Sequence, residues 1–581
     1  MSNLMHIFST GVSGLYASQA GIDVTGHNIA NVNTEGYSRQ RVTLETMDPS
    51  VRGNVIFGRG VNVDSVERIY DDLMASTIRD ETSDLQYYES MQLSLSKVEV
   101  YFNELEDGSG LGESMQEYFD AWSDLANTAP DQSDEALIKR ETLIEKASML
   151  SEKIQSSYNA LQSIKEESNT VIIEYVDEIN QISDNIAYLN KNIAQSEAGG
   201  EIANDFRDQR QVLLNRLAEI TNITVNERTS GQVAVYVSGN ALVDEGVVFN
   251  ISAEKASVDN PNVEIYWGTK DQDRDRVNIT TAFKSGSIAG EMYNRDDLIE
   301  GYKDTLNSLA TTLIEETNRI HSVGQGTNRL TQISSSNGVT NPTYTFNEPA
   351  GALPLTVNAG TLRISIYNES GTKVNDLDIE IDPDIDNMNS IITKISSADG
   401  NPNGGMIQAS ISVNNSIKIT AGSGYDFTFS EDTSNFLVAS GTYGFFSGSD
   451  ASNIGVSTII QDNSSFIAAS ASGAPGDNEN AAKISNLKGQ NLINEQDITI
   501  DEFYSFFVAS IGSDKSKADT YVSTKEQAIS QLSLKLEEIR GVSMDEEMTN
   551  LMKFQRAFEA SSRFITTIDE MLATLVNGLG A

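Results

Sequence analysis

Cysteine is absent from this chain of 581 residues. Disulfide bonds, thiolate catalysis and cysteine-ligated metal sites are therefore excluded. Long hydrophobic runs are also missing, because no stretch approaches the ~18 consecutive apolar residues that a membrane-spanning helix needs. The first twenty residues have neither a basic leading segment nor a continuous apolar core, so they predict an amphipathic helix and not a Sec signal. We expect no membrane insertion.

Basic residues are scarce as well. The chain has 40 Lys and Arg against 84 Asp and Glu, which gives a formal net charge of −44. Such a surface repels nucleic acid and anionic membranes. A nucleic-acid role is therefore excluded, and a solvated acidic surface is the favoured interpretation of the charge.

Patterns that indicate catalysis or cofactor binding are also lacking. The three histidines, His6, His27 and His321, show no H-E-x-x-H spacing, so we interpret them as structural or surface residues. The chain has no G-x-x-x-x-G-K-[ST] phosphate loop and no paired Ser and His that suggest a triad. We predict that the protein is not an enzyme and binds no cofactor.

One acidic stretch, residues 376–386, has alternating carboxylates. Its apolar positions, Leu377, Ile379 and Ile381, are expected to face a core while the acids face solvent. The stretch lacks the central Gly and the final Glu of an EF-hand loop. A solvated strand face is therefore favoured, and a weak cation site remains the alternative.

The C-terminal residues 541–581 carry a continuous helical pattern with no local partner. Positions at 3-4 spacing are apolar except at Glu547 and Ser561, which predicts a coiled-coil seam, the row of side chains that faces a second helix. The seam positions are Met544, Glu547, Leu551, Phe554, Phe558, Ser561, Ile565, Ile568, Leu572 and Leu575.

The N-terminal residues show the same spacing. Small residues alternate with apolar ones and would let a second helix approach closely, so we expect the two chain ends to lie side by side. One pair of helices cannot cover both apolar stripes. The pair either serves the stability of one molecule or is completed by neighbouring copies. The positions are Leu4, Phe8, Gly11, Leu15, Ser18, Ile22, Thr25 and Ile29.

Between the ends, the longest helical pattern runs from residue 133 to about 196, and short strands divided by Gly, Asn and Ser fill residues 328–477. The predicted fold is mainly α with one or two inserted β domains. We expect a terminal coiled coil from 1–50 and 541–581, a long-helix bundle body from 51–327 and 478–540 with a β subdomain near 223–290, and an outer antiparallel β insert at 328–477.

Residues 13–40 contain N-I-A-N-x-N-T-x-G-Y, and this stretch resembles the N-terminal signature of flagellar rod, hook and hook-associated proteins. Residues 541–575 are similar to the matching C-terminal end of that family. Residues 290–324 and 476–484 most resemble the hook-associated protein 1 family. Glu35 departs from the motif, which usually has proline there. The motif residues are Asn28, Asn31, Asn33, Gly36 and Tyr37.

This resemblance implies a secreted, extracellular structural protein that forms a ring of identical subunits at the hook–filament junction of the bacterial flagellum. It also implies type III export, a cytosolic export chaperone on the C-terminal helix, and contacts with hook protein and hook-associated protein 3. The paired terminal helices would form the assembly and chaperone interface. Its expected residues are Leu4, Phe8, Leu15, Ile22, Ile29, Leu551, Phe554, Phe558, Ile565, Ile568, Leu572 and Leu575.

Two alternatives remain open at this point. The chain could be a hook or distal-rod protein of the same structural class. In another class, the β insert could be a carbohydrate-binding or hydrolytic domain carried on the flagellum, which paired carboxylates in a concave pocket would support.

Overall fold

The computed structural model describes residues 2–52, 55–102, 110–128, 133–257, 260–268, 276–474, 476–493 and 497–579. The chain divides into two compact units. Residues 1–93, 167–294 and 516–581 form the first, which we call the terminal unit, and residues 94–166 and 295–515 form the second, the insert unit. The three-part division expected from the sequence stays a prediction.

Long helices dominate both units, as predicted. The 64-residue α4 (Asp134–Glu197) is the helix expected from residue 133 to about 196, and it supplies residues to each unit. So do α2 (Asp72–Tyr101) and α12 (Ile500–Arg540). The chain leaves helical geometry at residues 541–543, so α12 and α13 are separate helices.

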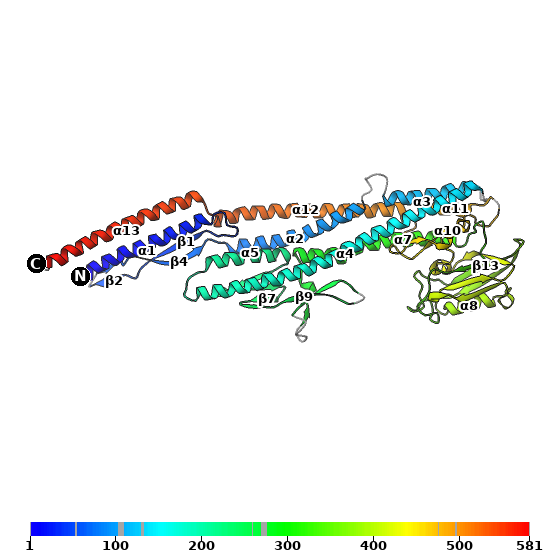
Figure 1. Ribbon diagram of the computed structural model, residues 1–581, viewed down its shortest axis with the longest axis horizontal. Helices are drawn as coiled ribbons and strands as arrows, with labels where there is room; N and C mark the ends of the chain where they lie inside the picture. Colours follow the sequence, from blue (N-terminus) through cyan, green and yellow to red (C-terminus); the bar gives the residue numbers. More distant parts are fainter. Residues whose placement is uncertain are drawn as a thin grey trace. The chain divides into compact units, whose positions relative to one another are not determined.

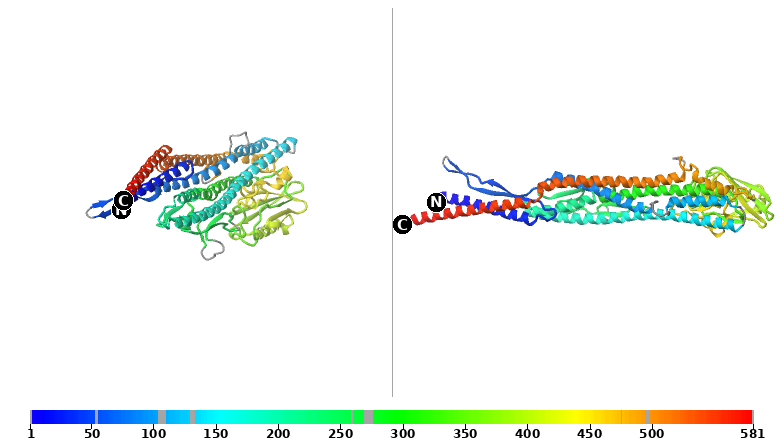
Figure 2. Two further views of the ribbon diagram at one scale, coloured as in Figure 1. Left: turned by 60° about the vertical axis from the view of Figure 1, so that its left-hand side comes forward. Right: turned by 90° about the horizontal axis from the view of Figure 1, so that it is seen from above.

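The two ends of the chain lie side by side in the terminal unit. The first helix, α1 (Ser2–Ala30), runs antiparallel to the last, α13 (Met544–Leu579), and all views place them together (Figures 1 and 2). An antiparallel ribbon of β1 (Gln40–Thr46) and β4 (Val61–Arg68) also contacts α1. Between these strands, β2 (Ser50–Arg52) and β3 (Val55–Phe57) form a small hairpin.

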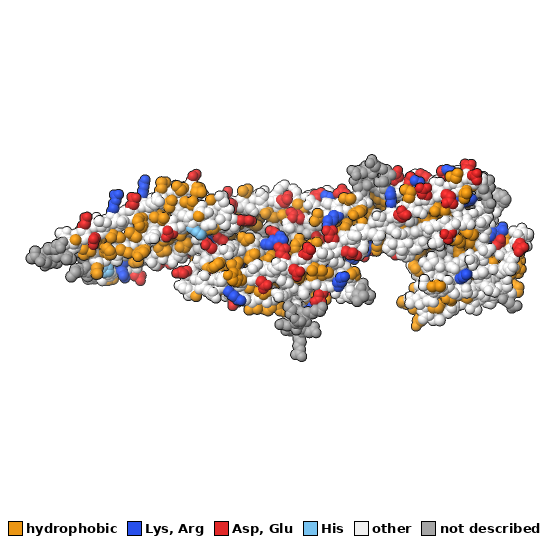
Figure 3. Space-filling model, viewed as in Figure 1, with side chains coloured by type: hydrophobic (Ala, Val, Ile, Leu, Met, Phe, Trp, Pro, Cys, Tyr) orange, Lys and Arg blue, Asp and Glu red, His pale blue; other side chains and the backbone are white. Residues whose placement is uncertain are grey.

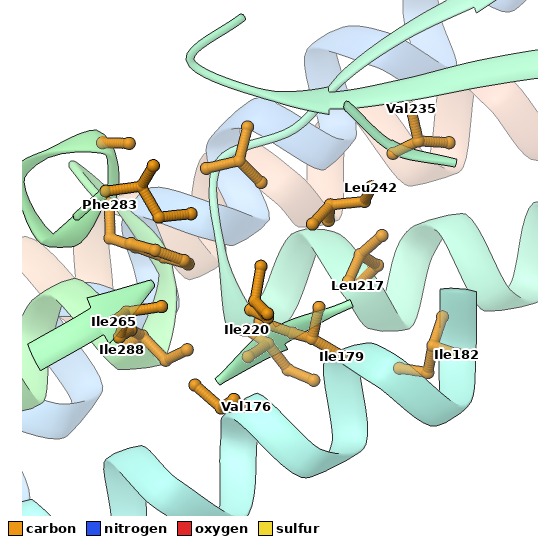
Figure 4. Close-up of a cluster of buried hydrophobic side chains, with 14 of the residues drawn as sticks. Val176, Ile179, Ile182, Leu217, Ile220, Val235, Leu242, Ile265, Phe283 and Ile288 are labelled. Carbon is orange, nitrogen blue, oxygen red and sulfur yellow. The ribbon is translucent and has the colours of Figure 1, made fainter. Parts of the chain in front are cut away.

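A hydrophobic core holds the rest of the terminal unit together (Figure 4). The C-terminal half of α4 contributes Ile172, Val176, Ile179, Ile182 and Ile186. They pack with α5 (Asn204–Ile220), α6 (Gly286–Tyr293) and two antiparallel sheets. The sheets consist of β5 (Thr224–Glu227), β6 (Val233–Val237), β7 (Asn240–Asp244) and β8 (Val247–Val248), and of β9 (Ile251–Lys255), β10 (Val263–Trp267) and β11 (Val277–Asn278).

The insert unit combines helices with the predicted antiparallel strands. Its helices include α3 (Leu111–Ala126), α7 (Ile299–His321) and α11 (Glu479–Asn486). One sheet has the order β14-β13-β17 and a second has the order β12-β16-β15, and α8 (Met388–Ser397) packs on both β14 and β15. The strands are β12 (Gln332–Ser334), β13 (Gly360–Asn368), β14 (Lys373–Ile381), β15 (Ile407–Ile411), β16 (Ile417–Ala421) and β17 (Tyr425–Asp432).

The acidic stretch lies mainly on β14, with the predicted alternation. Leu377, Ile379 and Ile381 are buried. The carboxylates on the other face form ion pairs, such as that of Asp378 with Arg363 at 2.6 Å. The charge of this strand is therefore partly balanced by basic side chains of the same unit.

His321, at the end of α7, joins that helix to two loops of the insert unit. Its side chain is buried, its Nδ1 donates to the carbonyl of Tyr443 at 3.0 Å, and its Nε2 accepts from the amide of Ala468 at 2.9 Å. Both ring nitrogens are satisfied only when the imidazole is neutral. Burial lowers the pKa of His321 to about 4, with the Tyr443 carbonyl acting in the opposite direction.

We expect acidification to weaken the insert unit through His321. The unfolded chain takes up this proton near pH 6.5 and the folded chain only near pH 4, so stability present above pH 6.5 is lost between these values. The loss is about 2–3 kcal/mol by pH 4.5. Denaturant unfolding followed by the fluorescence of Trp122, whose ring lies 6.4 Å from that of His321, measures it.

The matched variants are His321→Gln and His27→Gln. His321→Gln should lose this fall in the free energy of unfolding, whatever its stability at pH 7. His27→Gln should keep it. If the free energy of unfolding falls equally between pH 7 and 4.5 in wild type and in His321→Gln, His321 does not cause the pH dependence.

Candidate functional site

The paired terminal helices meet at glycines. A Cβ at Gly14 would lie 3.1 Å from Oγ of Ser561, and one at Gly21 would lie 2.5 Å from the ring of Phe554. On the same face, a Cβ at Gly11 would lie 3.0 Å from Cγ1 of Ile565. Successive glycines along α1 therefore face residues that come successively earlier in α13, so the two helices are antiparallel. Small side chains on α1 let the large side chains of α13 approach its backbone.

The most deeply buried seam positions on α1 are the small ones. Gly11, Ser18 and Thr25 are buried, and the hydroxyls of Ser18 and Thr25 each donate to the carbonyl four residues earlier at 2.7 Å. These internal hydrogen bonds satisfy polar groups that face an apolar helix. The prediction that small residues form the close contact is consistent with this geometry.

The predicted apolar seam residues are only partly covered in a single molecule. Ile568 is buried and Phe8 is exposed, whereas the other described members are half-buried. The side chains of Leu4 and Leu575 lie outside the described residues. The half-buried members are Leu15, Ile22, Ile29, Leu551, Phe554, Phe558, Ile565 and Leu572.

Asn28 is the centre of a buried polar network at the end of α1. Its Nδ2 donates to the carbonyl of Gln40 at 2.9 Å and to Oε2 of Glu547 at 3.0 Å. Its Oδ1 accepts from the amide of Gln40 at 2.9 Å and from the hydroxyl of Tyr37 at 2.7 Å. All four hydrogen-bonding positions of this amide are used. One side chain therefore joins α1, the following loop, β1 and α13.

Glu547 is the second member of that network and is 2% exposed. Besides Asn28, its carboxylate accepts from Nε of Arg39 at 2.8 Å and from Nη2 at 2.7 Å. The backbone amide of Arg39 donates to the carbonyl of Arg540, the last residue of α12, at 2.9 Å. A carboxylate at this depth is stable only with such charge-assisted partners. The pair therefore fixes where α13 starts relative to the motif loop.

The other motif residues shape the loop after α1. The Asn31 amide donates to the carbonyl of His27 at 3.0 Å, and Gly36 has φ +77°, where a Cβ would lie 2.5 Å from Val212. Burial, with the nearby carboxylates of Asp205 and Asp208, raises the pKa of Tyr37, so its hydroxyl remains a donor at neutral pH. Asn33 is exposed.

The first turns of α5 form the surface on which this loop rests. Asp208 accepts from the amide of Ser38 at 2.9 Å and from Nη1 of Arg68 at 3.1 Å. Burial raises the pKa of Asp208, and these two partners oppose that shift. Asp205 accepts from Nε2 of the Gln40 side chain at 2.9 Å. The motif is thus held by α5 and α13 together.

A cavity of about 530 Å³ lies beside the motif loop. His27, Tyr37, Tyr188 and Val212 line it, together with Glu35, the residue that departs from the motif. The Glu35 side chain is exposed. No hydrogen bond of the motif network described above involves Glu35, so the departure leaves that network intact.

Both α1 and α13 carry exposed apolar side chains (Figure 3). Phe8 and Met544 are seam positions and Phe564 lies beside Gly11 of α1, whereas the others are not on the predicted seam. On α13, three methionines follow each other at four-residue spacing and form one stripe. The β2–β3 hairpin is also apolar and exposed. Burial of such surface on association is favourable. The residues are Met5, Ile7, Phe8 and Tyr16 on α1, Met544, Met548, Met552, Phe564 and Met571 on α13, and Val51, Val55, Ile56 and Phe57 on or beside the hairpin.

Among the described residues, no three His, Asp or Glu side chains are placed to hold a metal ion. A separate search of the same part of the chain finds no helix that is long and apolar enough to span a bilayer.

Sequence reasoning missed the polar half of this site. Glu547 appeared only as a break in the apolar seam, and Arg39 and the acids of α5 gave no signal. A single acid on an otherwise apolar seam is the feature that could have indicated a buried ion pair, because an unpaired carboxylate there would be costly.

Three protein-family models match parts of the chain. The model described as "Flagellar hook-associated protein FlgK helical domain" matches residues 95–333. "Flagella basal body rod protein" matches residues 8–37, and "Flagellar basal body rod FlgEFG protein C-terminal" matches residues 536–578. The two models of rod proteins therefore match the two helices that pair.

Relatives extend along nearly the whole chain. Flagellar hook-associated protein 1 of Bacillus subtilis (strain 168) is 27% identical over 577 residues, which cover 97% of this chain and 96% of that protein. Its namesake from Escherichia coli (strain K12) is 24% identical over 98% of this chain and 99% of that one. The solved flagellar hook junction protein FlgK from Burkholderia pseudomallei shares the fold, with a TM-score of 0.51 at 14% identity, over 79% of this chain and 99% of that one. Along nearly its whole length, the chain is similar to members of the flagellar hook-associated protein 1 family.

Proposed function

We propose that this protein is a structural component of the bacterial flagellum that assembles with copies of itself into a ring at the hook–filament junction. The observation that carries the proposal is the antiparallel pair of α1 and α13, which binds its own chain through one face and leaves apolar side chains exposed on others. A stable monomer gains nothing from such exposure, whereas a ring of copies buries it.

The energy available for assembly is substantial. Full burial of a Phe, Met or Ile side chain is worth about 1.5–3 kcal/mol. The exposed apolar residues of α1 and α13 could therefore offset the entropy lost on association. The half-buried seam residues, such as Phe558 and Ile565, would complete their burial at the same time.

The partners follow from the position in the flagellum. We propose secretion by the flagellar type III apparatus, with a cytosolic chaperone that covers the apolar face of α13 before export. In the assembled flagellum, hook protein would lie below the ring and hook-associated protein 3 above it. We propose no catalytic activity and no cofactor.

A hook or distal-rod protein is the second candidate, since the matches at residues 8–37 and 536–578 are to rod-protein models. The match to the helical domain at residues 95–333 favours the junction. Antibody labelling of isolated flagella separates the two. A junction protein gives one narrow band between hook and filament, whereas labelling along the whole hook would overturn the proposal.

A further inference from the structure

Besides the cavity next to the motif loop, a cavity lies in the insert unit. The proposed assembly through the chain ends does not involve it. This cavity measures about 630 Å³ and lies where the loop after α7, residues 325–329, meets the loop of residues 466–474. Polar side chains dominate its lining, among them Gln325, Thr327 and Ser470. Apolar pockets bind ligands mainly through desolvation, whereas a polar cavity of this size selects ligands that form many hydrogen bonds.

Two arginines line this cavity in a protein that is poor in them. Arg140 from α4 is 3% exposed, and Arg329 enters from the loop after α7. Asp426 on β17 is the one carboxyl residue among the described residues of the lining. Its Oδ2 lies 3.9 Å from Nη1 of Arg329, well beyond the ~2.7–2.9 Å of a charge-assisted hydrogen bond. Asp426 and Arg329 therefore form a loose ion pair without a direct hydrogen bond.

The guanidinium of Arg329 is nevertheless held in place. It lies over the ring of Tyr367, 4.2 Å from the centroid. Stacking of this kind orients the guanidinium plane and leaves its N–H edge available. Nε of Arg329 and Oδ1 of Asp426 are both buried without a hydrogen-bond partner among the described residues. Buried polar atoms in this state are normally satisfied by ordered water or by a bound group.

The loops of the cavity approach each other through glycines. A Cβ at Gly326 would lie 2.3 Å from the carbonyl oxygen of Ser465, and one at Gly473, where φ is +73°, would lie 2.2 Å from Oε1 of Gln325. The backbones of Gln325 and Ser470 also exchange two hydrogen bonds, at 2.8 and 3.2 Å. The walls are therefore preformed.

We propose that this cavity binds a saccharide that carries a carboxylate, with Arg329 receiving the carboxylate and the amide and hydroxyl side chains receiving the sugar hydroxyls. A bidentate guanidinium pair with a carboxylate is short and directional. Gln325 offers an amide donor and an acceptor. The hydroxyls of Thr327 and Ser470 already donate to the carbonyl of Ser465 at 3.3 Å and to Asp477 at 2.9 Å, so they can only accept hydrogen bonds from sugar hydroxyls. Burial raises the pKa of Asp426, with Arg329 opposing the shift.

The cavity is suited to binding and not to hydrolysis. Glycoside hydrolysis uses two carboxyl groups on opposite sides of the scissile bond. The described lining contributes Asp426 alone. The sequence left open that the β insert binds carbohydrate. The proposal restricts that ligand class to acidic sugars and places the site between the loop of residues 325–329 and the loop of residues 466–474.

Isothermal titration calorimetry on the full chain tests the proposal. Digalacturonate, an acidic disaccharide, should bind, whereas lactose, a neutral disaccharide of similar size, and sodium acetate should bind at least about tenfold more weakly. Arg329→Gln should weaken the binding of digalacturonate by about tenfold or more. Thermal unfolding of the variant checks that the unit remains folded.

Arg363→Gln is the matched control, since Arg363 lies in the same unit, 37% exposed and paired with Asp378 and Glu431. It should leave the affinity unchanged. Absence of binding by digalacturonate, equal binding by acetate, or equal affinity in wild type and Arg329→Gln would each overturn the proposal. None of these outcomes affects the assembly proposal, which rests on the terminal unit.

Discussion

Replacing Phe558 and Ile565 together with aspartate is expected to abolish assembly while the insert unit stays folded. Both side chains are half-buried on the face of α13 that meets α1, and Ile565 lies against Gly11. A carboxylate there has no cationic partner among the described contacts and must be desolvated, which costs several kcal/mol for each group (roughly, by transfer energies). The helix pair should open, and the surface that neighbouring copies need should be lost.

Electron microscopy of cells that carry the double variant measures assembly, and the fluorescence of Trp122 reports on the insert unit. The matched control is Gln555→Asp with Ser562→Asp. It adds the same two charges to exposed positions of the same helix, in line with Met548 at seven-residue spacing. It should leave α1 paired with α13, and its effect on assembly reports on the exposed stripe separately from the seam. Normal filaments on cells with Phe558→Asp and Ile565→Asp would show that the seam is not the assembly element.

Glu547→Ala should be the most destabilising single change at the chain ends. It removes a carboxylate that is 2% exposed and that accepts from the Asn28 amide and from Arg39, so Arg39 keeps only the exposed Glu546 as a carboxylate partner. Breaking a buried ion pair from one side costs about 3–5 kcal/mol. The partial exposure of Arg39, 21% of its side chain, reduces the expected loss to about 2–4 kcal/mol. Hydrogen exchange of α1 and α13 amides measures this loss locally.

The neighbouring residue provides the control. Glu546 pairs with the same arginine, with its Oε2 at 2.9 Å from Nη1, but its side chain is 63% exposed. Glu546→Ala should therefore cost less than about 1 kcal/mol. If the two alanine variants exchange at the same rate, the buried network does not hold the helices together.

Much of the fold could be predicted from the sequence because helical periodicity is a local signal. The 3-4 spacing of α13 and the isoleucines of α4 both appear in the structure where their patterns place them. The small residues of α1 also indicated close helix contact. Gly14 and Gly21 escaped the pattern, since a glycine off the expected spacing gives no sign of what faces it.

The polar network could not be predicted, for a different physical reason. Asn28 and Glu547 are separated by 519 positions, and Ser38 and Asp208 by 170. Buried and exposed polar residues look alike in a sequence, and only the folded chain shows which acid meets which donor. The flagellar motif marked Asn28 and Tyr37 as important, but it did not reveal that α13 and α5 receive them.

The most direct test of the account is a disulfide between the chain ends, made with Gly14→Cys and Ser561→Cys in a protein that has no other cysteine. The Cβ of Ser561 lies 4.0 Å from the Cβ position at Gly14, within the ~3.5–4.5 Å that a disulfide spans. Gly14→Cys with Ser562→Cys, on an exposed position next to it, is the control.

The account predicts that mild oxidation of the purified chain closes the Gly14→Cys and Ser561→Cys pair within one molecule, faster than the control pair, and that the locked chain still assembles. Cross-links only between molecules, equal closure of both pairs, or a locked monomer that cannot assemble would contradict the antiparallel pairing of the chain ends as the unit of assembly.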